Sequence, residues 1–309
     1  MTFSHKSVLL NECIDALNVK PDGIYVDCTA GGGGHSKAIL DKLSDSGLLI
    51  AIDKDEDALS VCRERLQGNN VKFVHSDFKD LAQVLDSIGV EKADGILADL
   101  GVSSYQIDTP ERGFSYMASN APLDMRMDRE SPLTAKEVVN TYSEAELIRI
   151  IRDYGEEKFA KSIVKNIITE RQKGAIETCG QLVALIDKSV PRFSKNGGHP
   201  AKRTFQALRI EVNRELDGLE NFVSDAVERL NVDGRLAVIT FHSLEDRAIK
   251  HTFQDLATDC ICPSYIPVCV CNHKSKGMAL TKKPILPSKQ EQYDNPRSQS
   301  AKLRVFVKK

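Results

Sequence analysis

Short apolar segments alternate with helical patterns over the first hundred residues, and this alternation narrows the choice of folds more than any other feature. Continuously apolar strands such as Leu48–Asp53 are typical of a parallel sheet that helices cover on both faces. Strands and helices that alternate at this spacing predict an α/β fold with an open, doubly wound parallel sheet. The expected strands are 23–27, 48–53, 71–75, 95–100, 235–241 and 301–307, and the expected early helices are 35–43, 57–66 and 81–88.

The alternation stops after residue 100. Residues 101–132 are rich in Ser, Asp, Arg, Pro and Gly and form a stretch too long for an ordinary connection, so we expect a functional loop. Helical patterns follow over 134–190, and an apolar stripe over 205–226 predicts one long helix. The chain of 309 residues is long enough for two parts. We expect a core formed by 1–110 and 206–309, with a helical domain inserted at 111–205.

Length and apolar content exclude several classes of protein. No apolar run approaches the roughly 20 residues of a membrane span, and the apolar stretch before Asn11 is too short for a signal peptide. A cytoplasmic protein without a membrane partner is therefore expected. The eight cysteines should be reduced thiols there.

The formal net charge of −2 conceals two basic segments. Residues 188–214 hold seven Lys or Arg and one Glu, and residues 273–309 hold ten Lys or Arg and two acids, which gives +6 and +8. The remainder is strongly acidic. This segregation predicts a local surface for a polyanion, and a solvated surface with scattered lysines is the alternative of equal weight.

A glycine-rich turn, Gly31–Gly34, follows the first expected strand. Glycines between a strand and a helix let a ligand approach the backbone closely. Asp53 ends the next strand, 20 residues after Gly33, and an acid at this spacing accepts hydrogen bonds from ribose hydroxyls. This spacing suits both NAD and S-adenosylmethionine (SAM).

Two further strand ends favour SAM. Ser76-Asp77-Phe78 offers a carboxylate and an aromatic face for adenine, and Asp99 ends the fourth strand at the edge where ligands of such sheets bind. Several acids suit the cationic sulfonium and amino groups of SAM and would repel a pyrophosphate. The turn also departs from the G-x-G-x-x-G pattern at Ser36. SAM is therefore the expected cofactor, and an NAD dehydrogenase rests on the turn alone.

At residues 99–104, Asp-Leu-Gly-Val-Ser-Ser, the sequence resembles the bacterial 16S ribosomal RNA cytosine-N4 methyltransferases, a class I SAM-dependent family. The resemblance covers nearly the whole chain, and several long motifs in fixed order make it specific. Gln299 departs from it, since the family often has Arg there. The matching segments are 27–36, 112–115, 122–128, 154–157, 199–201, 203–207, 209–210, 241–247 and 295–297.

The resemblance implies methylation of the exocyclic amine of one cytidine in the decoding region of 16S rRNA, with the small ribosomal subunit as partner. It also implies a Rossmann-like core interrupted by a small helical domain. The oligomeric state stays open, a homodimer being one arrangement considered. The SAM-binding positions carried over from the family are Gly33, Gly34, His35, Asp53, Phe78, Asp99 and Gln106.

Asp99 is the first catalytic candidate, with Ser103 and Ser104 beside it. In-line methyl transfer to N4 needs no covalent enzyme intermediate, but an acceptor near the amine would take its proton. The alternative is that Asp99 only binds the cofactor and that the serines cap a turn.

His242 and Asp246 follow the fifth expected strand at the same edge and are further catalytic candidates that could orient the base or relay the proton. Equally, Ser243 could cap a helix that begins at Leu244, with the acids favoured in its first turn. In the long loop, Asp124, Arg126 and Asp128 alternate with methionines, and an internal ion pair is as well supported as RNA contact.

RNA binding should depend on the two basic segments, because rRNA is a polyanion and the target base must leave any stack. The candidate RNA-binding residues are Lys202, Arg203, Arg209, Lys302 and Arg304.

The cysteines at 260, 262, 269 and 271 form two C-x-C pairs, with His251 and His273 nearby. Cys260, Cys262, Cys269 and Cys271 could hold a tetrahedral zinc ion, although this spacing is tighter than that of common zinc sites. The alternative is a small hairpin with reduced thiols.

Two rival functions remain besides the cytosine methyltransferase. One is methylation of another nucleobase amine, such as adenine N6. The other is a ribosome-assembly factor that keeps the fold for binding alone; the complete set of cofactor residues argues against it.

Overall fold

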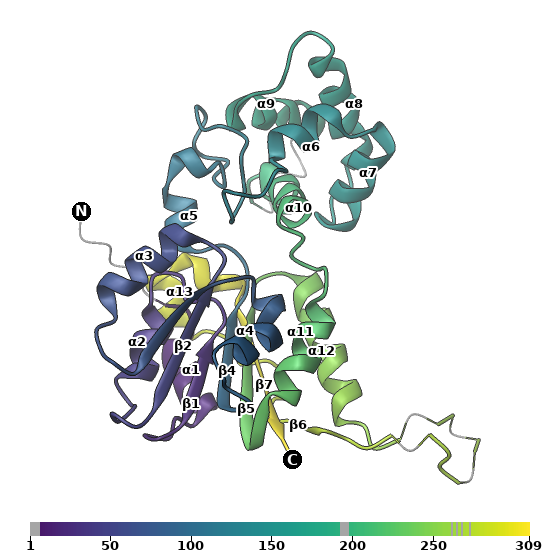
Figure 1. The fold of residues 1–309 in the computed structure, drawn as a ribbon. Coiled ribbons are helices and arrows are strands. Elements are labelled where there is room, and N and C mark those ends of the chain that lie inside the picture. Colours follow the sequence, from purple (N-terminus) through teal and green to yellow (C-terminus); the bar gives the residue numbers. More distant parts are fainter. Residues whose placement is uncertain (1–6, 192–197, 261, 264, 267, 272) are drawn as a thin grey trace. The chain divides into compact units, whose positions relative to one another are not determined.

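The computed structural model describes residues 7–191, 198–260, 262–263, 265–266, 268–271 and 273–309. The chain separates into two compact units (Figure 1). Unit 1 combines Met1–Gly101 with Gly218–Lys309, and unit 2 is Val102–Asp217. The inserted domain expected at 111–205 lies within unit 2.

Unit 1 is built on a seven-stranded sheet with the order β3-β2-β1-β4-β5-β7-β6. The parallel part, β3-β2-β1-β4-β5, has the strand order of doubly wound nucleotide-binding folds, so the predicted α/β class is confirmed. The sheet as a whole is mixed, since at one edge β7, whose direction was not predicted, runs antiparallel to β5 and β6. The strands are β1 (Ile24–Asp27), β2 (Leu48–Asp53), β3 (Val71–His75), β4 (Ala93–Asp99), β5 (Leu230–Thr240), β6 (Gly277–Ala279) and β7 (Lys302–Lys308).

Helices cover both faces of this sheet (Figure 1). Successive residues of β2 enter opposite cores: Leu49 and Ala51 pack with α1, α2 and α3, whereas Ile50 and Ile52 pack with α4, α11 and α12. This alternation explains why the strand is apolar from Leu48 to Ile52. The helices of unit 1 are α1 (Leu10–Leu17), α2 (Gly34–Leu40), α3 (Glu56–Arg65), α4 (Leu81–Ser87), α11 (Leu219–Glu228), α12 (Ser243–Ala257) and α13 (Lys289–Asp294), with short 3-10 turns η1 (Phe78–Asp80) and η4 (Pro296–Ser300).

Unit 2 is helical and has its own apolar core. Side-chain capping boxes start α5, α6, α7 and α9, each pairing a Ser or Thr with a Gln or Glu three residues later. Its elements are α5 (Ser104–Asp108), η2 (Pro110–Arg112), α6 (Ala135–Thr141), α7 (Glu144–Asp153), α8 (Ala160–Arg171), α9 (Cys179–Ser189) and α10 (Ala201–Asn213).

The single long helix predicted over 205–226 is wrong. Arg214 and Gly218 both have positive φ, so α10 ends at Asn213 and α11 begins at Leu219. The apolar stripe is real, but its two halves belong to different cores, that of unit 2 and that of unit 1. Across the described part of the chain, no helix is both long and apolar enough to cross a membrane.

Candidate active site

Asp27 ends β1 and is buried directly before the glycine turn. Its carboxylate accepts hydrogen bonds from the Ser36 hydroxyl at 2.6 Å and the Thr29 amide at 3.2 Å. Burial raises its pKa to about 6 although these donors lower it. Asp27 therefore ties the start of α2 to the strand and adds negative potential to the edge of the sheet.

Asp53 ends β2, at the same edge, since β1 and β2 are parallel neighbours. It accepts hydrogen bonds from the amides of Gly31 at 2.7 Å and Asp55 at 2.9 Å. Burial raises its pKa to about 6, against the effect of both amides. The carboxylate thus holds the glycine turn in place, next to where the resemblance expects a ribose.

Asp99 ends β4 on the other side of β1. Its amide donates to the Thr29 hydroxyl at 2.6 Å, whereas its Oδ1 is buried without a hydrogen-bond partner among the described residues. Burial, reinforced by the charges of Asp27 and Glu245, raises the pKa of Asp99 well above its usual range. A buried acceptor without a donor is costly, and a cation or hydrogen-bond donor from a ligand would relieve that cost.

His35 supplies a buried neutral group beside Asp99. Its Nε2 donates to the carbonyl of Val8 at 3.0 Å, because a carbonyl can only accept, and its Nδ1 lies 3.7 Å from Oδ2 of Asp99. Burial lowers the pKa of His35 to about 4. The unprotonated Nδ1 therefore does not neutralise Asp99, which leaves that carboxyl to a ligand.

The four glycines of the turn do different things. Gly31 has φ +50° and Gly32 faces open space, so the backbone is accessible there. By contrast, a Cβ at Gly33 would meet a cysteine sulfur of α3 at 3.2 Å, and one at Gly34 would lie 1.8 Å from the Ser7 hydroxyl. Glycine is thus favoured at 33 by the positive φ of +75° and at 34 by the close approach of Ser7, and any contact that these two residues make with a cofactor comes from their backbone.

Phe78 begins η1, after the end of β3. Its ring meets Phe222 edge-on with centroids 4.9 Å apart, and the ammonium of Lys79 lies 5.8 Å from its centroid. The neighbouring Asp77 caps η1 and lies 3.8 Å from Lys54. The aromatic face and the carboxylate expected for adenine are thus both present beyond β3, as parts of the turn that starts η1.

His242 starts α12 at the end of β5. Its Nδ1 accepts from the amide of Glu245, whose carboxylate accepts in return from the His242 amide, so the predicted cap at Ser243 is wrong by one residue. Ring atom Nε2 lies 3.1 Å from the same carboxylate. His242 is therefore a capping residue, and a catalytic role for it stays a prediction.

Asp246 is joined to β7 by two ion pairs. Its oxygens lie 2.7 Å from Nε of Arg304 and 3.0 Å from Nζ of Lys302. Burial would raise the pKa of Asp246, but the hydrogen bonds from both cations lower it below its usual range. The structure thus brings together one predicted catalytic acid and two predicted RNA-binding cations, and it gives each of them an internal partner.

Within unit 2, Ser103 and Gln106 form the capping box of α5. The Ser103 hydroxyl accepts from the Gln106 amide at 3.2 Å, and Gln106 Oε1 accepts from the Ser103 amide at 3.0 Å. The side chain of Gln106 is buried, and Ser104, the first residue of α5, is half-buried. The capping interpretation of Ser103 is confirmed, while catalytic and cofactor roles for these residues stay predictions.

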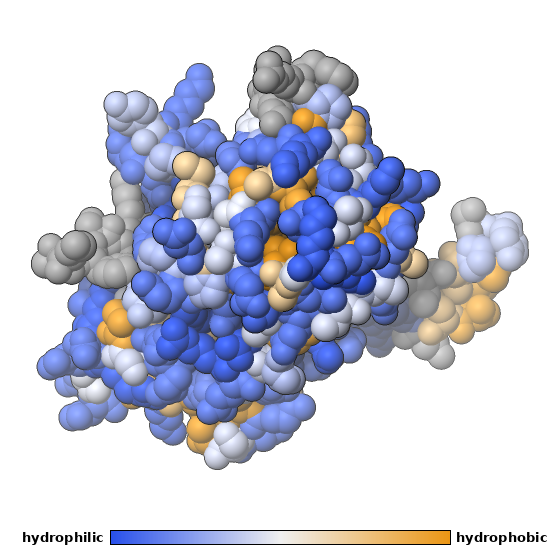
Figure 2. All heavy atoms as spheres, turned by 90° about the horizontal axis from the view of Figure 1, so that it is seen from above, coloured by the Kyte–Doolittle hydropathy of each residue, from blue (hydrophilic) through white to orange (hydrophobic). Residues whose placement is uncertain are grey.

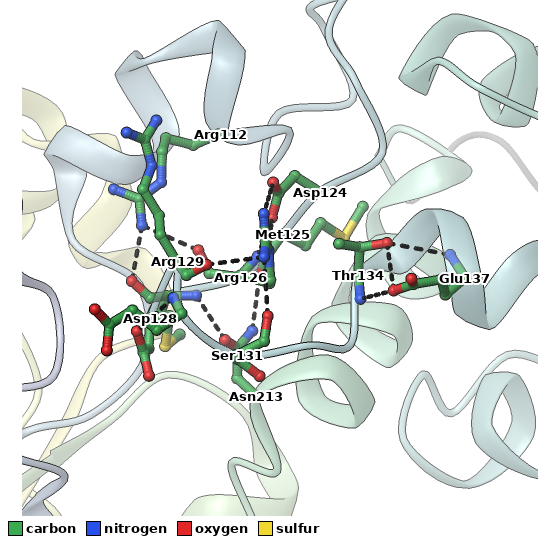
Figure 3. Close-up of polar contacts among 12 residues, drawn as sticks. Arg112, Asp124, Met125, Arg126, Asp128, Arg129, Ser131, Thr134, Glu137 and Asn213 are labelled. Carbon is green, nitrogen blue, oxygen red and sulfur yellow. Dashed lines mark hydrogen bonds and ion pairs between the residues drawn. The ribbon is translucent and has the colours of Figure 1, made fainter.

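The long loop is organised around a buried arginine, as Figure 3 shows. Arg112 donates to the carbonyls of Arg126 at 3.0 Å and Met127 at 2.8 Å. From α10, Asn213 accepts from the Met127 amide at 2.7 Å and donates to the Met125 carbonyl at 2.8 Å. The expectation of one loop over 101–132 is thus wrong for its first part, which forms α5 and η2. Beyond Arg112, these side-chain bonds to backbone take the place of regular structure and hold Met125 at φ 61°.

Asp124, Arg126 and Asp128, for which the sequence left open an internal ion pair or RNA contact, make hydrogen bonds within the loop (Figure 3). Asp124 binds Arg126 through two hydrogen bonds of 2.8 Å, and Asp128 accepts from the Glu130 amide at 2.8 Å. The internal ion pair, one of two predicted alternatives, is confirmed.

The basic residues of α10 divide into two kinds. Lys202 is exposed, and Arg203 is 55% exposed with Glu157 3.9 Å away. Arg209 instead binds Glu215 through two hydrogen bonds of 2.8 Å and is largely buried. An RNA contact by Arg209 stays a prediction, but its guanidinium already has an internal anion.

The four cysteines of the C-x-C pairs come together. Their sulfurs all lie within 4.8 Å of one another, in a group that contains neither His251 nor His273. The described residues of 260–271 form no strand, so the alternative of a hairpin is not supported there.

Three residues at the carboxyl edge of the sheet were not predicted from the sequence as site residues: Asp27, Thr29 and Glu245. The first two stand directly before the glycine turn, and an acid at a strand end was the available signal. The effect of Glu245 on Asp99 crosses from α12 to β4, and no local pattern reveals it.

Comparison with known proteins shows the family to which the chain belongs. The chain is 56% identical over 311 residues to "Ribosomal RNA small subunit methyltransferase H" of Clostridioides difficile, with 100% of both chains covered. It is 55% identical over 311 residues to "Ribosomal RNA small subunit methyltransferase H 2" of Agathobacter rectalis, with 100% and 99% covered. A protein of the first name from Clostridium botulinum strain Kyoto is 55% identical over 309 residues, with 100% of both chains covered. Because a model of the MraW methylase family also matches residues 2–309, the chain belongs to that family.

Proposed function

We propose that this chain transfers a methyl group from SAM to the exocyclic N4 amine of a cytidine in the decoding region of 16S rRNA. The carrying observation is the acidic edge of the sheet, where Asp99 has a buried oxygen without a donor among the described residues. Relatives at 55–56% identity that bear the name of a small-subunit rRNA methyltransferase support the substrate. We also propose a cytoplasmic location with the small ribosomal subunit as partner.

The residues present fit SAM. When bound, SAM supplies a methyl group on a positively charged sulfur. Asp27, Asp53 and Asp99 offer carboxylates that such a cation would stabilise, because burial raises the pKa of all three and so makes an uncompensated negative charge costly. We propose that Asp53 accepts from the ribose hydroxyls, that the ring of Phe78 contacts the adenine, and that the remaining contacts come from Gly33, Gly34, His35 and Gln106.

We propose Asp99 as the acceptor of the amine proton. The N–C bond forms as the C–S bond breaks, and one proton must leave the nitrogen. The transfer removes the positive charge that had favoured the carboxylate form of Asp99, so its proton affinity rises when the proton departs. Holding the two reactants in line can supply roughly 7–11 kcal/mol. We propose that Ser104 contacts the base and that Ser103, His242 and Asp246 act as positioning residues.

For the RNA we propose contacts from Lys202 and Arg203 on α10 and from Lys302 on β7, because these cations are wholly or partly exposed. Arg209 and Arg304 would act through their ion pairs with Glu215 and Asp246. The target cytidine must be turned out of its stack to reach the acids.

The test is incubation of the protein with under-methylated small subunits and labelled SAM, followed by nucleoside analysis of the rRNA. N4-methylcytidine at one position is expected. Labelled N6-methyladenosine would instead support the alternative amine, and RNA binding without any product would support an assembly factor. Asp99→Asn should lower kcat by about 10²–10⁴-fold with a smaller effect on SAM affinity. The exposed Asp41→Asn is its matched control.

Two points do not concern methyl transfer itself, namely the oligomeric state and a metal site. The homodimer stays a prediction, and light scattering of the purified protein would test it. A metal ion at the four cysteines would have no part in the reaction, since SAM alone supplies the methyl group.

A further inference from the structure

The segment between α12 and β6, residues 258–276, is here called the cysteine arm. Its described part extends away from the sheet (Figure 1), and hydrophobic colour gathers on it in Figure 2. Tyr265 is 83% exposed, and Val268 and Val270 are each 70% exposed. These three large apolar side chains thus lie in solvent, and a segment without a core needs another source of order, such as a metal.

The four sulfurs of the arm supply such a source. The Sγ of Cys260 lies 3.5 Å from that of Cys269 and 3.8 Å from that of Cys271, and the last two are 3.4 Å apart. Zinc binds thiolate at about 2.3 Å, so the sulfurs of an ideal tetrahedron are about 3.8 Å apart. A disulfide needs about 2.05 Å. The observed separations thus match sulfurs around a common ion.

Backbone amides support two of these sulfurs. The Cys262 amide donates to Sγ of Cys260 at 3.4 Å, and the Val270 amide donates to Sγ of Cys262 at 3.4 Å. Donors of this kind stabilise the negative charge of a thiolate ligand and fix its orientation. Each C-x-C pair thus contributes two sulfurs, and the second pair folds back onto the first.

We propose that Cys260, Cys262, Cys269 and Cys271 bind one structural zinc ion. Four protein ligands close the coordination sphere, which is typical of structural rather than catalytic zinc, and thiolates favour zinc over harder cations. Loading releases one proton from each thiol and changes no oxidation state. The 15 residues of α12 span about 22 Å between the end of β5 and the arm, so the ion orders the arm without touching the reacting atoms.

The test is metal analysis of the untagged full-length protein purified under reducing conditions. About one zinc per chain is expected. Cys260→Ser and Cys271→Ser should each lose most of it, whereas the exposed arm variant Tyr265→Ser should keep it. Cobalt(II) in place of zinc should give the intense visible absorption of a tetrahedral thiolate site, and the two serine variants should lack it. Chelation should speed the alkylation of four thiols, counted by mass spectrometry.

Three results would contradict the zinc proposal. Iron instead of zinc, zinc content unchanged by both serine variants, or a native mass lower by four hydrogen atoms from two disulfides would each overturn the proposal. SAM binding, measured on the same samples, reports separately on the methyltransferase site. Its loss in every sample, including wild type, would count against the proposed function and not against the metal.

Discussion

Removing the charge of Asp246 should destabilise unit 1 by about 3 kcal/mol, because Arg304 would then be buried without an anion. The Arg304 side chain is 6% exposed and its Nε lies 2.7 Å from the carboxylate. Breaking a buried pair by removing one partner costs about 3–5 kcal/mol. The lower end applies here, since Asp246 keeps 13% exposure and the second cation, Lys302, is 36% exposed and can turn to solvent.

The assay is thermal unfolding of Asp246→Asn, Arg304→Met and the double variant. A loss of about 3 kcal/mol lowers Tm by roughly 6–12 °C in a protein with large domains. The double variant should recover most of it, because with Arg304 also replaced no buried cation is left without an anion. Asp255→Asn, an exposed acid on the same helix, should change the stability by less than about 0.5 kcal/mol.

The stabilising contribution of Asp246 should also depend on pH, in a direction that follows from its pKa. The pKa of Asp246 is lower in the folded protein than in the unfolded chain, so its stabilising contribution is complete above about pH 4 and is lost as the pH falls through the folded value. The deficit of Asp246→Asn should therefore shrink in acid. An unchanged Tm together with a kcat reduced more than about 100-fold would refute the reasoning and restore a direct catalytic role.

SAM affinity should weaken as the pH falls below about 6, by about tenfold per pH unit for the proton that Asp53 takes up, because the ionised carboxylate is the better acceptor for the ribose hydroxyls; Asp53→Asn should make this calorimetric profile shallower, while Asp27 still titrates near the same pH. Gly34→Ala should destabilise the SAM-free protein by about 1–3 kcal/mol through its clash with Ser7, whereas Gly32→Ala should not; equal Tm values for the two variants would contradict the packing role. Lys202→Ala should reduce the salt dependence of rRNA binding, log K against log salt, by about 0.7, and an unchanged slope would remove Lys202 from the interface.

The sequence predicted the parallel half of the sheet because its strands carry a local signal. Residues 48–52 are apolar throughout, and both faces of β2 are in fact covered. The turn at Gly31–Gly34 and the acids at 53 and 99 could be assigned to one edge, since the carboxyl ends of parallel strands meet there. Family membership could be inferred as well, because motifs in fixed order are a property of the sequence alone.

The break between α10 and α11 and the direction of β7 could not be predicted, because both depend on tertiary packing. The apolar residues over 205–226 keep one helical periodicity, which predicts a single helix. The structure instead has two helices, α10 and α11, because the two halves of the stripe pack into separate cores. The direction of β7 likewise depends on pairing with β5, since a strand pattern carries no direction.

The charged residues show most clearly what the sequence determines and what only the tertiary structure determines. The sequence established that the C-terminal segment is basic, but it could not distinguish a cation facing solvent from one facing an acid on another element. Arg304 meets Asp246 across 58 residues, and Glu245 perturbs Asp99 from another element. Local patterns determine secondary structure because their interactions are short in sequence. Tertiary packing alone decides which charges are paired and which stay available, because Coulomb energies depend on distance in space and on burial.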